Sequence, residues 1–135
     1  MKRQIIVLLV CFAGMMCTTS CQESLPERCQ REAKEYTEKN CPVKVENNVI
    51  LDSMTFDRKT LTINYFYTLE NELDDETMIG TQADNLHTLM LNALKNATNI
   101  KLYKENGYNF HYIYLSRKDN RKKLLDILLK KEDYQ

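Results

Sequence analysis

Residues 61–69 read LTINYFYTL, which is the clearest period-two segment in the chain. β-Branched and aromatic residues fill it, and such residues favour the pleated, half-buried surface of a strand. Asp57-Arg58-Lys59-Thr60 precedes it as a plausible turn, and residues 49–56 before that turn have a mixed apolar pattern. These features predict two neighbouring strands joined as a β-hairpin.

A second period-two segment lies in the last third of the chain. After Asn106-Gly107, the aromatic residues alternate with other side chains and predict a strand over residues 108–115. Residues 118–121 then form a plausible turn. Residues 123–129, KLLDILL, fit either a buried strand or a short helix. Their length and the preceding turn favour a strand, and hence a second hairpin.

Helical patterns precede each hairpin. Ser24 and Glu27 have the spacing of a capping box with Pro26 in the first turn, so we expect a helix over residues 25–39 that ends before Pro42. From Ile79 to Ala97 apolar residues recur at steps of four and three, which predicts a second helix. We expect Leu86 and Met90 of this seam to be buried against a sheet.

The order helix–hairpin–helix–hairpin predicts an α+β fold. Its economical form is a four-stranded, mostly antiparallel sheet with both helices packed on one face.

The N-terminal residues predict export. Lys2 and Arg3 precede a twelve-residue apolar run, Ile5–Met16, and small residues lead to Cys21. A spanning helix needs about 20 residues, so we interpret residues 1–20 as a cleaved signal peptide of lipoprotein type. Plain secretion and an uncleaved anchor are the alternatives. Residues 21–135 then form one small α+β domain with a short N-terminal tether.

Lipidation of Cys21 would anchor this domain to a bacterial membrane. A diacylglycerol and an amide-linked acyl chain such as palmitate supply more than one hydrocarbon tail, which is enough for stable attachment. We therefore expect a cell-envelope protein, at the outer membrane or on the periplasmic face.

Composition narrows the partners and the chemistry. The signal holds two of the 19 Lys and Arg and none of the 19 Asp and Glu, so the mature part has a net charge near −2 and no nucleic-acid partner is expected. Cys29 and Cys41 remain outside the signal and the lipid site. An envelope compartment permits a disulfide between them. Cys29 lies inside the predicted helix and Cys41 just beyond its end, about 15 Å of helical rise away, so we expect two separately buried thiols, with the disulfide as the alternative.

No catalytic or metal-binding constellation is recognisable. The two histidines, His87 and His111, stand singly, without the three or four convergent ligands of a zinc site. The acidic run Asp74-Asp75-Glu76 is explained by the first turn of a helix. We therefore expect no enzyme activity, no metal and no cofactor.

Tyrosines are the one feature that suggests a binding surface. On a helix-covered sheet face they would be core residues, whereas on a bare face their rings would form an amphipathic surface of the sort found at interfaces. The candidate residues are Tyr65, Tyr67, Tyr112 and Tyr114.

Particular residues along this order resemble a broad group of small exported bacterial proteins without an established function. The resemblance covers roughly residues 30–134 and supports a strand at 123–129; members usually carry a glycine in the last turn, which residues 118–121 lack. The junction Cys21-Gln22-Glu23 is similar to lipoproteins of Bacteroides-type bacteria. The matching pieces are Asn40-Cys41-Pro42, Val45, Leu51-Asp52, Leu61 to Tyr67, Ile100-Lys101, Tyr103-Lys104, Gly107, Phe110 to Tyr114 and Asp133-Tyr134.

The leading hypothesis is thus a non-catalytic envelope lipoprotein that binds a protein or glycan partner through its sheet. An enzyme of unrecognised type and a structural or stress-related envelope protein are the alternatives.

Overall fold

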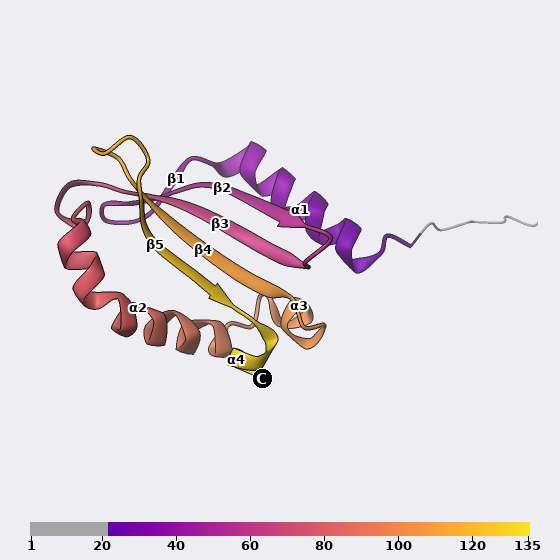
Figure 1. Cartoon of the computed structure of the whole chain (residues 1–135). Coiled ribbons are helices and arrows are strands. Elements are labelled where there is room, and N and C mark those ends of the chain that lie inside the picture. Colours follow the sequence, from indigo (N-terminus) through magenta and orange to yellow (C-terminus); the bar gives the residue numbers. More distant parts are fainter. Residues whose placement is uncertain (1–21) are drawn as a thin grey trace, which may run out of the picture.

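The computed structural model describes residues 22–135 (Figure 1). The expected signal peptide and the expected lipid site at Cys21 lie outside these residues. Helix α1 spans Leu25–Asn40, and the predicted capping box is confirmed: the Ser24 Oγ accepts from the Glu27 N–H, and the Glu27 carboxylate accepts from the Ser24 N–H. This reciprocal pair satisfies amide groups that the first turn would leave without partners.

The sheet has five strands, so the prediction of four strands is wrong. The additional strand is β1 (Val43–Glu46), which pairs antiparallel with β2 (Val49–Asp57), and β2 pairs antiparallel with β3 (Thr62–Leu69). Asn48 closes the β1–β2 turn with a φ of 64°, a conformation that asparagine tolerates. β1 is too short to display a period, which is why its sequence gave no strand signal.

The second half of the chain returns to the sheet beside β3. A short 3-10 helix, η2 (Asn71–Leu73), leads into α2 (Glu76–Asn96) and α3 (Lys101–Glu105). Strand β4 (Asn109–Ser116) then pairs parallel with β3, because this helical crossover brings the chain back to the start of β3. Strand β5 (Lys123–Leu129) pairs antiparallel with β4, which confirms a strand there, and α4 (Lys131–Tyr134) ends the chain.

The strands lie in the order β1-β2-β3-β4-β5, and the helices pack on one face of this sheet. Two buried clusters on that face combine helix and strand residues. In the first, Cys29 of α1 and Leu94 of α2 pack with Ile63 and Phe110. In the second, Ile79 of α2 packs with Val49 and Leu69. Because side chains alternate along a strand, the intervening residues occupy the other face.

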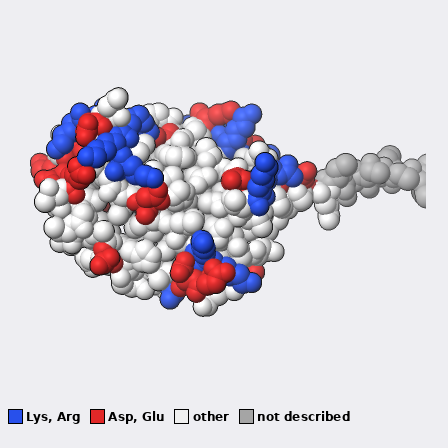
Figure 2. Space-filling model, viewed as in Figure 1, with Lys and Arg blue, Asp and Glu red and all other residues white. Residues whose placement is uncertain are grey.

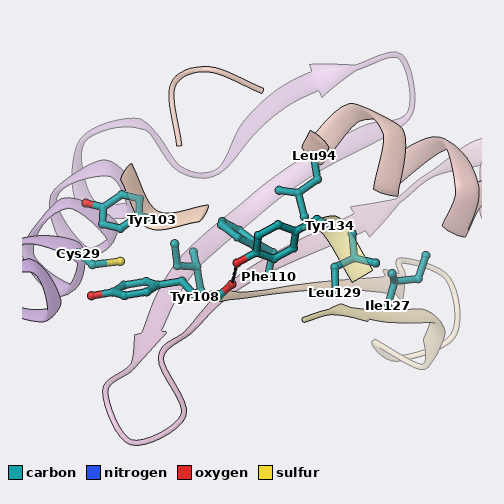
Figure 3. Close-up of a cluster of buried hydrophobic side chains, with 9 residues drawn as sticks. Cys29, Leu94, Tyr103, Tyr108, Phe110, Ile127, Leu129 and Tyr134 are labelled. Atoms are coloured by element: carbon teal, nitrogen blue, oxygen red, sulfur yellow. Dashed lines mark hydrogen bonds between the residues drawn. The ribbon is translucent and has the colours of Figure 1, made fainter. Parts of the chain in front are cut away.

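The first cluster is the main core (Figure 3). Phe110 and Leu129 are completely buried in it, and Leu94 enters it from α2. Tyr134 closes it from the C-terminus, where its hydroxyl donates to the Tyr108 carbonyl at 2.6 Å. The last turn of the chain is therefore part of the core.

Helix α1 is fixed on β2 by one polar contact as well as by apolar packing. The Thr37 hydroxyl donates to the Met54 carbonyl at 3.0 Å and accepts from the Met54 N–H at 2.8 Å.

Cys29 and Cys41 are both free thiols, the first buried and the second half-buried. Burial is the main cause that raises the pKa of the Cys29 thiol to about 12, so this thiol is unreactive at neutral pH.

Cations and acids are mixed over the surface. In the view of Figure 2, blue and red side chains lie beside one another in most of the charged clusters, with uncharged surface between them. This face therefore carries no extended field of a single sign.

None of the helices in the described part of the chain is both long enough and apolar enough to span a bilayer.

Candidate functional site

Helix α2 is fully buried against the sheet only near its two ends, and its middle is partly buried. Only Ile79, near its start, and Leu94, near its end, are buried. Leu86 and Met90, which belong to the same apolar seam, are only half-buried, and Leu89 is 56% exposed. The expectation that Leu86 and Met90 are buried is therefore wrong: they pack against the edges of the two buried clusters but stay half-buried, because a cleft adjoins them.

An apolar cleft of about 400 Å³ lies between this middle part of α2, the sheet and β1. A volume of this size is in the range of pockets that hold ligands or partner side chains. The residues that line it are Val45, Glu46, Val49, Tyr67, Leu69, Leu73, Ile79, Leu86, Met90, Tyr114 and Leu125.

Stacked tyrosines form part of the cleft floor. The parallel pairing of β3 with β4 sets Tyr67 beside Tyr114 with ring centroids 4.7 Å apart, and Tyr65 beside Tyr112 at 5.0 Å. These are the four tyrosines selected from the sequence, and all four lie on the helix-covered face. They are half-buried there, because the helices do not meet over them.

The two tyrosine pairs differ in their surroundings. Tyr67 and Tyr114 line the cleft, whereas Tyr65 lines a smaller cavity of about 200 Å³ beneath α1. Burial is the main cause that raises the pKa of Tyr67 to about 12, and the nearby Tyr36 and Glu46 add to it; burial and nearby charges also raise the pKa of Tyr114. Both hydroxyls are thus protonated at neutral pH and able to donate a hydrogen bond.

Strand β1 supplies the rim of the cleft. Its register against β2 shifts between Lys44 and Glu46, and Val45 within that bulge and Glu46 directly after it both line the cleft. Bulges re-aim side chains in this way. Val45 is 45% exposed, so the rim offers apolar as well as charged surface.

The opposite face of the sheet carries His111 among both polar and apolar side chains. The His111 Nδ1 lies 3.0 Å from the Asn64 Oδ1, its Nε2 contacts the Asp126 carboxylate, and Lys123 Nζ donates to that carboxylate at 2.6 Å. Burial works against the charged form of Asp126, but the bonds from Lys123 and His111 outweigh it and hold the pKa of Asp126 below its usual range.

His87 is exposed on α2, so the structure does not bring the two histidines together. Within residues 22–135 there is no group of three His, Cys, Asp or Glu that would hold a metal ion.

The acidic run before α2 has structural partners, as the sequence indicates. The Asp75 carboxylate caps α2 by accepting from the Met78 N–H at 2.9 Å. Asp74 is buried and accepts from the Ser116 hydroxyl at 2.6 Å and from the Lys118 N–H at 2.8 Å. These bonds connect the start of α2 to the β4–β5 turn.

Sequence reasoning found the tyrosines but missed the cleft. Between Thr77 and Leu94 the helix sequence contains a single formal charge, Asp84, although most of these residues are exposed. A long exposed helix with so little charge is unusual for a purely solvated surface. The low charge of this helix, together with an exposed Leu89 outside the apolar seam, is the sequence feature that could have indicated the cleft.

Two solved structures share this α+β fold. A protein of Pseudomonas aeruginosa described as secreted superimposes with a TM-score of 0.69 at 9% identity, over 83% of this chain and 98% of that one. The pilotin EpsS of the Vibrio vulnificus type 2 secretion system superimposes with a TM-score of 0.58 at 7% identity, over 80% of this chain and 89% of that one. At such identities the likeness concerns the fold alone.

The chain belongs to the family called Domain of unknown function (DUF8479), whose model matches residues 24–125. No curated protein matches the sequence.

Proposed function

We propose that this protein is a non-catalytic lipoprotein of the bacterial cell envelope that holds an apolar segment of a partner protein in the cleft. The observation that carries the proposal is the cleft itself, an opening of about 400 Å³ that α2 spans while it is buried only at its ends. An apolar occupant would remove the half-buried side chains of Leu86 and Met90 from water, at about 25 cal/mol per Å² of apolar surface.

The lining favours a protein segment over a glycan. Ten of the eleven lining side chains are aliphatic, methionine or tyrosine, and one is charged. A glycan brings many hydroxyl groups, and these would lose their hydrogen bonds to water without finding partners on such a wall. Methionines such as Met90 adapt well to the side chains of a partner.

The position of the cleft favours a partner away from the membrane. The chain enters the domain at the start of α1, whereas β1 and the first half of α2 lie near the other end of the molecule (Figure 1). The cleft lies between β1 and the middle of α2. Helix α1 has 16 residues and is therefore about 24 Å long. With Cys21 acylated, the lipid would attach at the end of the domain that is farther from the cleft. The similar folds of a secreted protein and of a secretion-system pilotin are in keeping with an envelope role.

Two substitutions on the same helix test the proposal. Met90→Glu places a charge in the cleft, and the matched control Leu89→Glu places the same charge on the exposed side of α2. The full-length protein, tagged and extracted from its own envelope in mild detergent, should co-purify with a specific protein. We expect the control to retain that protein and Met90→Glu to lose it. Equal recovery by both variants, or repeated recovery of nothing by the wild type, would refute the proposal.

A further inference from the structure

Glu46 is the only charged residue among those that line the cleft in the described part of the chain. We propose that the bound segment carries a Lys or Arg beside its apolar residues, and that Glu46 pairs with this cation. The inference rests on the proposed function, because it concerns the occupant of the same cleft. It adds a charge requirement to what would otherwise be general apolar binding.

The Glu46 carboxylate is available for a partner. It lies exposed at the end of β1, and none of the ion pairs within residues 22–135 involves it. By contrast, neighbouring acids at this end of the molecule are engaged: Glu70 pairs with Arg117, and Glu72 accepts from the Asn48 amide at 2.7 Å. A carboxylate at the rim of an apolar cleft is therefore left without a cation from its own chain.

Two tyrosines place further cation-binding groups near this carboxylate. Tyr67 and Tyr114 line the same cleft as Glu46. Burial is the main cause that raises the pKa of both tyrosines, and the charge of Glu46 contributes to both shifts. Phenolic oxygens accept hydrogen bonds from ammonium or guanidinium groups, and tyrosine ring faces attract cations. A basic side chain would therefore meet a carboxylate, hydroxyl oxygens and aromatic rings at one end of the cleft.

An acidic or neutral segment would lack these contacts. A Glu or Asp on the occupant would face Glu46 at close range with the same sign of charge, which penalises the wrong partner. Because Glu46 is exposed, the attraction is that of a rim charge. It acts mainly on the association rate and weakens as salt is added.

A pair of model peptides tests the charge requirement directly. The probes are fluorescein-labelled Leu/Ala peptides of about ten residues, roughly 15 Å long as a helix, which differ only in a central Lys or Glu. The full chain is held in nanodiscs of zwitterionic lipid, and binding is followed by fluorescence anisotropy at low and high salt. Empty nanodiscs give the background of peptide binding to lipid.

We expect the wild type to bind the Lys peptide about five- to tenfold more tightly than the Glu peptide at low salt, as for a pairing of exposed charges. Glu46→Gln should abolish this preference and Glu46→Lys should reverse it. The control Glu132→Gln, an exposed acid on α4 at the other end of the molecule, should leave it unchanged.

The outcomes separate the two proposals. Equal binding of both peptides by the wild type, unaffected by Glu46→Gln but lost in Met90→Glu, would overturn the role of Glu46 and leave the cleft as the binding site. Binding of neither peptide, or binding that Met90→Glu leaves intact, would overturn the cleft itself.

Discussion

Leu94 and Met90 lie four residues apart on the same seam of α2, and their truncation should have very different costs. Leu94 is 2% exposed within the main core, so Leu94→Ala leaves an enclosed cavity. Substitutions of this kind cost about 2–5 kcal/mol of unfolding free energy. Met90 is half-buried and lines the cleft. Full burial of a Met side chain is worth about 1.5–3 kcal/mol, and about half of that applies here, so Met90→Ala should cost about 1 kcal/mol.

The measurement is urea unfolding followed by far-UV circular dichroism, since the chain has no tryptophan. Lys95→Ala, on the exposed side of the same helix, is the control and should change stability by about 0.5 kcal/mol or less. If Met90→Ala proves as costly as Leu94→Ala, the middle of α2 packs on the sheet in solution. The cleft would then be closed, and the reasoning about its occupant would fail.

Four further predictions follow from single features. Asp74→Ala should cost about 1–3 kcal/mol because the buried Ser116 hydroxyl loses its acceptor. Burial opposes ionisation of Asp74, but the bonds from Ser116 and Lys118 outweigh it and hold the pKa of Asp74 below the ordinary value. The ionised Asp74 therefore stabilises the fold at neutral pH, and this stabilisation is lost as the pH falls through the lowered pKa, below about 4. Urea midpoints measured over this pH range should show the loss. A cost that persists unchanged into acid would contradict this. Arg121 has a φ of 63° in the β4–β5 turn, so Arg121→Gly should raise the free energy of unfolding by about 0.5–1 kcal/mol and shift the urea midpoint upward; a lower midpoint would show that the turn relaxes without strain. Acylation of Cys21 should add several hundred daltons to the intact mass of the mature protein, given two or three acyl chains, and an unmodified chain that begins elsewhere would refute it. EDTA should leave the melting temperature unchanged, whereas a large decrease would reveal a structural metal.

Sequence patterns predicted the elements whose length displays a period. β3, β4 and α2 have eight or more residues each, and their periods of two or about 3.6 were clear. β1, α3 and α4 have four or five residues and no readable period; their backbone hydrogen bonds and packing come from the assembled fold. The resembled group usually carries a glycine in this turn, and residues 118–121 have none; Asn120 and Arg121 both adopt the positive φ that glycine favours.

The site was only partly predictable for a different reason. Periodicity says which side of a helix faces the sheet, but not how far the helix stands from it. Leu86 and Met90 do point to the sheet side, yet they line an opening because α2 is buried only near Ile79 and Leu94. Likewise, the pattern placed the four tyrosines on one face of their strands, while the choice between a covered and a bare face depended on the crossover through α2.

The parallel pairing of β3 with β4 has a consequence for the order of folding. Each hairpin joins strands that are close in sequence, whereas the pair at the centre of the sheet joins Asn64 to His111, 47 residues apart. Contacts between distant residues form late, because closing the long loop costs conformational entropy before the contacts add any stability. A newly synthesised chain should therefore assemble its two hairpins first and pair the two central strands last, and the floor of the cleft would exist only after that slow step.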